Sequence, residues 1–127
     1  MQFLMMIHLD ERRWAEFLEK DPTASAMSHE LWNWYEERAR SGKILTAGRL
    51  RESATATTVR QAKGRPVITD GPFAETKEVL GGFHLLECRD RDEAIAIART
   101  FPGLRLDGTV VEVRRVLTDA EETQRWR

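Results

Sequence analysis

The segment Thr69–Phe83, TDGPFAETKEVLGGF, gathers side chains that suit acid–base chemistry or the binding of an anion. Asp70 precedes Gly71-Pro72, and a proline fixes its own φ and keeps the residue before it out of the helical region. The chain must therefore turn here, with a carboxylate, the Lys77 ammonium and a hydroxyl close together. Asp70 either braces this turn by bonding to the backbone or acts as an acid, a base or a ligand-binding group.

Histidines supply groups that change charge near neutral pH. His8 follows an apolar run at the end of a predicted strand, and His29 lies at the start of a predicted helix. Either imidazole could exchange protons with Asp70, although a structural His8 and a solvated His29 are the alternatives. His84 lies in the middle of another predicted strand and is expected to face an interface between two copies. The predicted catalytic residues are therefore Asp70, His29 and His8.

Lys77 lies between Glu75 and Glu78. It is either a clamp for a carboxylate or phosphate or part of an exposed ion pair worth about 0–1 kcal/mol. The predicted ligand-binding residues are Arg49, Phe73, Glu75 and Lys77. Three scattered histidines and the single Cys88 do not match the spacing of zinc ligands, so we expect no metal and no cofactor. Cys88 is expected to be a small core residue.

Hydrophobic periodicity predicts the elements that position these residues. The predicted helices cover 11–20, 28–41 with Ser28 as its cap, and a third segment capped by Asp90 and ended by Pro102-Gly103. The predicted strands cover 1–8, 43–50, 55–62, 66–69, 79–88 and 109–116, with a turn at Lys63-Gly64 between the third and fourth. Residues 118–127 form a charged tail, either a short exposed helix or a frayed end.

The order of these elements is β-α-β, a small hairpin, then β-α-β, which predicts an α+β, ferredoxin-like sheet with an inserted hairpin. The helices of that arrangement cover one face only, yet the first strand is apolar on both faces. We therefore expect a second copy to cover the other face, giving a homodimer. The topology also predicts that six residues line one cleft: His8, His29, Arg49, Asp70, Glu75 and Lys77.

Composition limits the broad class of the protein. The 127 residues suit one domain with its own core, which we place at residues 1–117. The 20 basic and 21 acidic residues nearly cancel, which argues against direct binding of nucleic acid. No apolar run approaches the roughly 20 residues of a membrane span, and no signal peptide is evident, so we expect a cytoplasmic protein without a membrane partner.

The motif TDGPFAETKEVLGGF resembles the signature of the DGPF branch of the YCII-related (YciI-like) family, and FLMMIH, SGKILTAG, ATTVR and GTVVEVRRV extend the resemblance over residues 2–117. The resemblance implies a ferredoxin-like, dimeric α/β barrel. It also implies relatives fused to, or encoded beside, extracytoplasmic-function sigma factors. YciI-like relatives are suspected of using a His–Asp pair; Asp70 matches its aspartate, and His29 lies near its helix-start histidine.

Two functions follow as hypotheses. In the first, the protein is a cofactor-independent dimer that binds a small anionic molecule and transfers protons through Asp70 and a histidine. In the second, it is a non-enzymatic module that acts in transcription regulation through a sigma factor, as the resemblance implies. A purely structural role for the Asp70 loop is the alternative to both.

Overall fold

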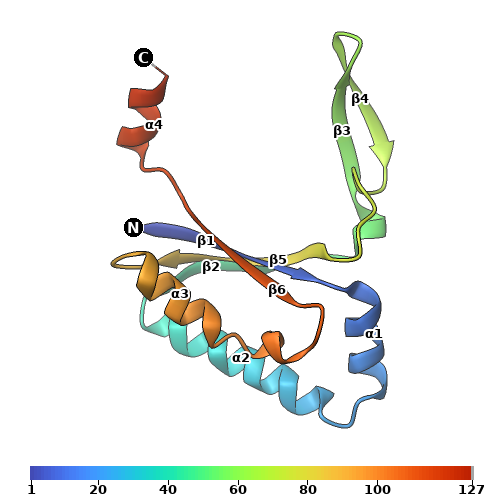
Figure 1. Cartoon of the computed structure of the whole chain (residues 1–127), viewed down its shortest axis with the longest axis vertical. Helices are drawn as coiled ribbons and strands as arrows, with labels where there is room; N and C mark the ends of the chain where they lie inside the picture. Colours follow the sequence, from blue (N-terminus) through green and yellow to red (C-terminus); the bar gives the residue numbers. More distant parts are fainter. Residues whose placement is uncertain (127) are drawn as a thin grey trace.

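A computed structural model describes residues 1–126 as a four-stranded sheet with helices on one side and a separate hairpin on the other (Figure 1). The strands are β1 (Gln2–Leu9), β2 (Ile44–Arg49), β3 (Thr57–Ala62), β4 (Arg65–Asp70), β5 (Val79–Glu87) and β6 (Val110–Arg115). The helices are α1 (Glu11–Lys20), α2 (Ala24–Arg40), α3 (Arg91–Arg99) and α4 (Asp119–Arg125), with short 3₁₀ turns at η1 (Ser53–Thr55) and η2 (Pro102–Arg105).

The main sheet has the strand order β2-β5-β1-β6, and each neighbouring pair is antiparallel. This order confirms the predicted α+β, ferredoxin-like arrangement. The helices α1, α2 and α3 lie on one side of the sheet, whereas the hairpin and α4 extend from the other side (Figure 1). Among the described residues, no helix combines the length and the apolarity that a membrane span needs.

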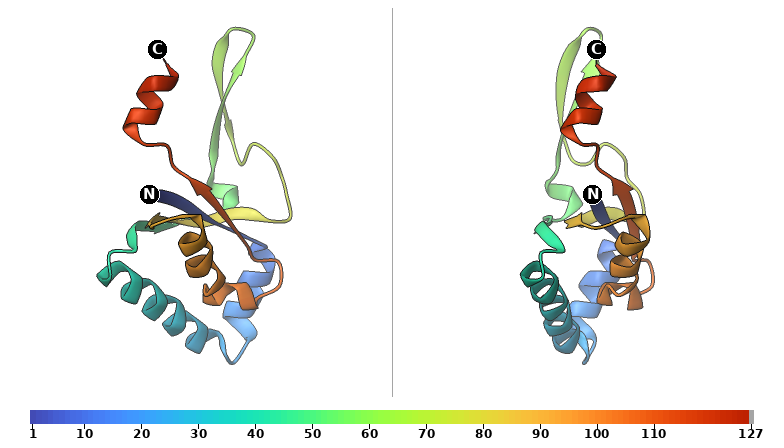
Figure 2. Two further views of the ribbon diagram at one scale, coloured as in Figure 1. Left: turned by 60° about the vertical axis from the view of Figure 1, so that its left-hand side comes forward. Right: turned by 90° about the vertical axis from the view of Figure 1, so that its left-hand side faces the viewer.

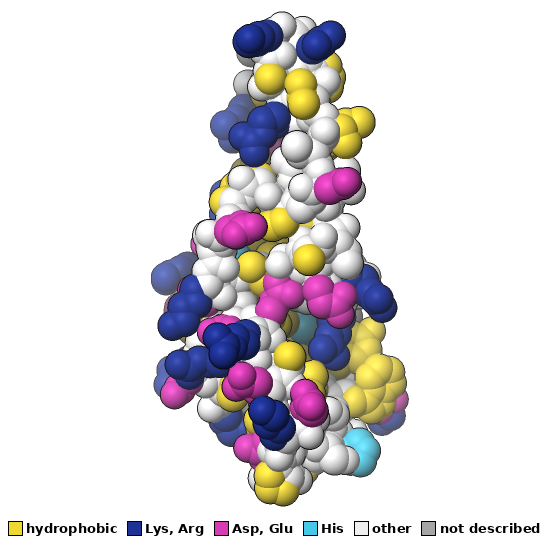
Figure 3. All heavy atoms as spheres, turned by 90° about the vertical axis from the view of Figure 1, so that its right-hand side faces the viewer, with side chains coloured by type: hydrophobic (Ala, Val, Ile, Leu, Met, Phe, Trp, Pro, Cys, Tyr) yellow, Lys and Arg dark blue, Asp and Glu magenta, His cyan; other side chains and the backbone are white. Residues whose placement is uncertain are grey.

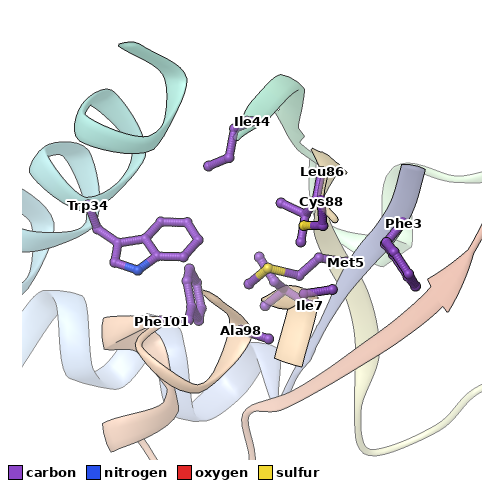
Figure 4. Packing of buried hydrophobic residues seen from close by; sticks show 10 residues of the cluster. Phe3, Met5, Ile7, Trp34, Ile44, Leu86, Cys88, Ala98 and Phe101 are labelled. Atoms are coloured by element: carbon purple, nitrogen blue, oxygen red, sulfur yellow. The ribbon is translucent and has the colours of Figure 1, made fainter. Parts of the chain in front are cut away.

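The core lies between the sheet and its helices (Figure 4). Alternate residues of β1, Phe3, Met5 and Ile7, point into it, as the period of two in a strand requires. Met5 and Leu86 are completely buried, and each such side chain contributes about 1.5–3 kcal/mol to folding. The core thus fixes which face of each strand is directed toward the helices.

Two predicted helix starts are confirmed, and one is wrong. Asp10 accepts a hydrogen bond from the Arg13 N–H at 3.1 Å and caps α1, and Asp90 accepts from Glu93 at 2.9 Å and caps α3. Helix α2, however, begins at Ala24 rather than at Ser28. The Ser28 hydroxyl instead donates to the Ala24 carbonyl at 3.1 Å, a bond that serine also makes inside a helix.

The hairpin β3–β4 forms a sheet of its own. Lys63 and Gly64 connect its strands with φ values of 52° and 83°, the positive values of a two-residue turn that matches strand twist. Val59 pairs with Ile68 on one face, and these side chains are 64% and 70% exposed. An isolated two-stranded hairpin is marginally stable in water, so this apolar pair calls for a covering surface.

No element within residues 1–126 packs flat on the face of the main sheet opposite the helices (Figure 2). The side chains of this face include Leu4 and Met6 of β1 and Phe83 and Leu85 of β5, all half-buried. The predicted tail forms α4, whose first turn is held by a capping box between Thr118 and Glu121. Arg127 of the predicted tail lies outside the described residues.

Candidate functional site

Asp70 and His8 lie toward the same end of the main sheet. The Gly71 N–H donates to the Ala56 carbonyl at 2.7 Å, which ties the foot of the hairpin to η1. The Ser53 N–H of η1 in turn donates to the Glu11 carboxylate at 3.1 and 3.2 Å, immediately after β1 ends. The foot of the hairpin and the end of β1 are therefore linked through segments that are distant in sequence.

The two side chains nevertheless have different surroundings. The His8 Nε2 lies 3.1 Å from the Glu112 carboxylate of β6, on the bare face of the sheet. Asp70 is exposed at the foot of the hairpin, and no ion pair or side-chain hydrogen bond joins it to another described residue. His8 is thus paired with a carboxylate, but that carboxylate is not Asp70.

The structure does not bring His29 and Asp70 together. His29 is exposed on α2, which lies on the helical side of the sheet. Asp70 ends β4, which extends from the opposite side (Figure 1). The sheet separates these two predicted partners.

The loop 71–78 folds back on the hairpin instead of lining a cleft. The Thr58 hydroxyl donates to the Gly71 carbonyl at 2.7 Å, and Arg60 donates to the Phe73 carbonyl at 3.5 Å. Phe73 is 80% exposed. Glu75 and Lys77 are exposed as well, and neither forms an ion pair within residues 1–126. This loop braces the hairpin, as the structural alternative expected.

His84 is placed by strand register on the side that faces the helices. It pairs with Met5 of β1 and with Ala47 of β2, and it shares a face with Leu86. Its ring stands against Trp34, Phe101 and Tyr35, with centroid distances of 5.3, 6.1 and 6.2 Å. The expectation that His84 faces an interface between copies is therefore wrong.

The imidazole of His84 is neutral and incompletely satisfied. Its Nδ1 is buried, and no hydrogen-bond partner for it is found among the described residues. Burial lowers the pKa of His84 to about 4, because an apolar surrounding disfavours the charged form. Buried polar atoms without a partner are rare and cost about 1–3 kcal/mol each.

Gly82 and Arg49 lie beside His84 on the same face. They pair with each other across β5 and β2, two residues along from the pair His84 and Ala47. Gly82 carries no side chain to cover the ring, and a Cβ there would lie 3.1 Å from the Gly48 carbonyl oxygen. Arg49 is exposed and has no carboxylate partner within residues 1–126. A positive charge is thus available next to a neutral imidazole.

We call this region the His84 recess and define it by Trp34, Tyr35, Arg49, Gly82, His84 and Phe101. Figure 3 views the molecule from the end of the sheet where β1 continues into α1. Acidic and basic side chains border a hollow at that end of the molecule (Figure 3). In the His84 recess, Trp34 and Phe101 belong to the core, Tyr35 and His84 are half-buried, and Arg49 is exposed. Its reachable polar groups are one guanidinium, one phenol and one imidazole. Such a combination suits a small planar molecule that carries an anionic group.

Comparison with known proteins places the chain in a family. A family model described as the YCII-related domain matches residues 1–118. The chain belongs to the YCII-related family. This YCII-related chain is also 40% identical over 74 residues to an uncharacterised protein of Rhizobium meliloti (strain 1021). That alignment covers 58% of this chain and 60% of the relative, so the match spans less than two thirds of the relative's length.

A solved structure shares the fold of this YCII-related chain. It is the 5-chloro-2-hydroxyhydroquinone dehydrochlorinase TftG of Burkholderia phenoliruptrix AC1100, in complex with 2,5-dihydroxybenzoquinone. The TM-score is 0.53 and the sequence identity 16%, with 94% of this chain and 97% of that chain covered. At this identity the likeness concerns the fold alone.

Sequence reasoning did not select His84 as a candidate site residue. The alternation of side chains along a strand could have indicated its position, because His84 is two residues from Leu86 and two from Gly82 and so shares one face of β5 with them. Within the described part of the chain, no group of three or more His, Cys, Asp or Glu residues is placed to hold a metal ion. Arg49 is the predicted ligand-binding residue that lies on the same strand face as His84.

Proposed function

We propose that the protein is a homodimer that binds a small, planar, anionic molecule in the His84 recess of each subunit. The observation that carries this proposal is the buried Nδ1 of His84, which has no partner among residues 1–126 and lies on the same strand face as Arg49. A fold optimised only for stability would place an apolar ring at this position. The cost of the unpaired nitrogen is instead consistent with a role in binding.

Each part of the recess has a chemical role in this proposal. Arg49 attracts the anionic group and can bind a carboxylate through two parallel hydrogen bonds. The half-buried ring of Tyr35, whose centroid lies 6.2 Å from that of His84, packs against the planar body of the ligand, while Trp34 and Phe101 support His84 from the core. The neutral His84 accepts a proton or a hydrogen bond from a ligand hydroxyl, which is the task of a general base.

Binding of an anion also makes His84 a better base. A negative charge beside an imidazole favours its protonated form, so the pKa of His84 rises from its low value when the ligand is bound. The imidazole is therefore neutral in the free protein and becomes able to accept a proton in the complex. Proton transfer would then be coupled to the presence of the ligand.

The homodimer is supported by the bare face of the sheet. Leu80 and Val110 are 42% and 50% exposed, in addition to the exposed pair Val59 and Ile68 of the hairpin. The hairpin and α4 extend on the same side as this face (Figure 2). The sheet of a second copy packed there would bury the apolar residues of this face and of the hairpin together. The resulting interface would be two-fold symmetric, with the same surface used by both subunits.

Calorimetric titration with a metabolite panel tests this function. The panel contains aromatic carboxylates and hydroxylated quinones and hydroquinones, the latter because the dehydrochlorinase of similar fold is described with 2,5-dihydroxybenzoquinone. We expect a hit with the wild type that is lost in His84→Phe and Arg49→Gln but retained in Asp70→Asn. Absence of any hit contradicts the proposal. Loss of ligand binding in Asp70→Asn, with binding retained in the other two variants, would place the site at the foot of the hairpin, as the sequence predicted.

Association with a sigma factor stays a prediction that rests on the resemblance alone.

A further inference from the structure

A second groove lies between α3 and the edge strand β6, away from the His84 recess. Its floor is apolar and includes Ile95, Val111 and Val113. Three arginines, Arg91, Arg99 and Arg115, lie at its border. A groove of this kind favours an occupant that combines apolar surface with negative charge.

Two of these arginines are available to such an occupant. Arg91 and Arg99 are exposed, and neither has a carboxylate partner within residues 1–126. Arg115 is different, because its two terminal nitrogens donate to the Glu121 carboxylate of α4 at 2.9 and 2.8 Å. The groove therefore has unneutralised positive charge near the point where the chain leaves the sheet toward α4.

The segment Leu117–Trp126, which we call the arm, has the complementary character. None of the described residues of α4 is buried, and Leu117 and Trp126 are 40% and 77% exposed. Asp119, Glu122 and Trp126 recur at intervals of three and four residues and so form one stripe along the helix. An acidic and aromatic stripe without a covering surface is unusual in a protein that consists of a single folded subunit.

We propose that the arm of one subunit docks in the α3–β6 groove of a second copy of this chain. Trp126 then covers the apolar floor, and Asp119 and Glu122 face Arg91 and Arg99. This inference rests on the homodimer proposed above. It adds a second contact to that dimer and gives the arm a role.

The reach of the arm fits a dimer whose sheets pack face to face. Val116–Thr118 separate the end of β6 from the start of α4 and, when extended, span about 10 Å. Two packed sheets lie about 10 Å apart, so α4 begins at the level of the partner's sheet. The arm extends away from the helices of its own subunit (Figure 2), which argues against its own groove as the target.

The stripe and the row of arginines also have matching lengths. Asp119 and Trp126 are seven residues apart, which corresponds to about 10 Å along a helix. Arg91 and Arg99 are eight residues apart on α3, or about 12 Å. The acidic and aromatic side chains can therefore face the arginines and Ile95 along the full length of the contact.

Disulfide cross-linking of full-length chains tests which groove receives the arm. One chain carries Glu122→Cys and the other Ile95→Cys, both in a Cys88→Ala background because Cys88 is the native cysteine. Mixing them under mild oxidation is expected to yield a covalent dimer of unlike chains. A chain that carries both substitutions, mixed with excess cysteine-free chain, is expected to lose its cross-link. A cross-link that persists there would show that the arm folds into its own groove and would overturn the inference.

A charge reversal with rescue gives an independent test. Arg99→Glu is expected to raise the Kd of the dimer about tenfold, because it disrupts one charge pair in each of the two symmetric arm contacts, and Glu122→Arg in the same chain is expected to restore it. Lys20→Glu on the exposed end of α1 is the matched control and should leave the Kd unchanged. A monomeric wild type would contradict the homodimer itself. A dimer whose Kd is unaffected by Arg99→Glu would contradict the arm alone, and ligand binding in the His84 recess can be measured in either case.

Discussion

The imidazole of His84 stands edge-on to the indole of Trp34, with ring centroids 5.3 Å apart and ring planes at 84°. The indole N–H could in principle satisfy a nearby nitrogen, but it donates to the Thr100 hydroxyl at 2.8 Å. Arg38, another nearby donor, is bound to the Trp34 carbonyl at 3.0 Å and to Thr100 at 3.3 Å. The donors around Trp34 are thus directed elsewhere, and Nδ1 of His84 has no hydrogen-bond partner among the described residues.

The first prediction concerns the stability of His84→Phe. Phenylalanine keeps an aromatic ring against Trp34 and Phe101 and removes the buried nitrogen that lacks a partner. We expect the free energy of unfolding to stay the same or to rise by up to about 1 kcal/mol. Urea denaturation of both proteins measures this. A loss of several kcal/mol would mean that His84 has a structural partner and would contradict a binding role.

The second prediction is a pH dependence of stability due to His84. In the unfolded chain an ordinary histidine binds a proton below about pH 6.5. In the folded protein burial lowers the pKa of His84 to about 4, so between these values only the unfolded chain binds the proton. The contribution of His84 to stability is therefore complete above about pH 6.5 and is lost as the pH falls toward 4.

Between about pH 6.5 and pH 4, the free energy of unfolding is expected to fall by about 2 kcal/mol because of His84. This value is reduced for the partial exposure of the ring. His84→Phe is the control, because it removes this titration and leaves His8 and His29 in place. The difference between the two unfolding free energies, measured from pH 7 to pH 4, isolates the effect. Parallel curves for the two proteins would show that burial does not perturb His84.

Much of the fold could be predicted from the sequence because local chemistry determines it. Asp10 and Asp90 cap helices where the pattern places them, and Lys63-Gly64 forms the expected turn. The start of α2 could not be predicted in the same way. A serine can cap a helix or bond to the carbonyl four residues before it, and Ser28 does the latter.

The candidate site was less predictable than the fold, because it depends on which face of the sheet each side chain occupies and not on the order of the elements along the chain. Strand β5 is apolar on both faces, with Phe83 and Leu85 on one and Leu86 on the other. Its period of two therefore does not reveal which face His84 occupies. The hairpin, moreover, extends from the sheet as a unit, and this separates Asp70 from His29 although both were expected at one edge.

The third prediction concerns Ile68 and the dimer. Ile68 and Val59 form the exposed apolar face of the hairpin. In the proposed homodimer this face is covered, so Ile68→Asp would place a charge in an apolar contact and raise the Kd of the dimer at least about tenfold. Thr69→Asp is the control, because the neighbouring residue of a strand lies on the opposite face. Sedimentation velocity over a dilution series measures both, and equal effects of the two substitutions would argue against this face as the interface.

The fourth prediction is an uptake of protons when the ligand binds. At about pH 6 the free protein holds His84 neutral, because burial lowers the pKa of this residue to about 4. An anion bound between Arg49 and His84 raises that pKa, so each site is expected to take up a fraction of a proton on binding. Calorimetry in two buffers with different ionisation enthalpies measures this uptake directly.

His84→Gln separates proton uptake from binding itself. The glutamine amide can still form a hydrogen bond in the recess, but it cannot be protonated at this pH. We therefore expect weaker binding without any uptake of protons in this variant. The same uptake in His84→Gln and in the wild type would assign the proton to a group other than His84. In that case the His84 recess would bind the ligand without taking part in proton transfer.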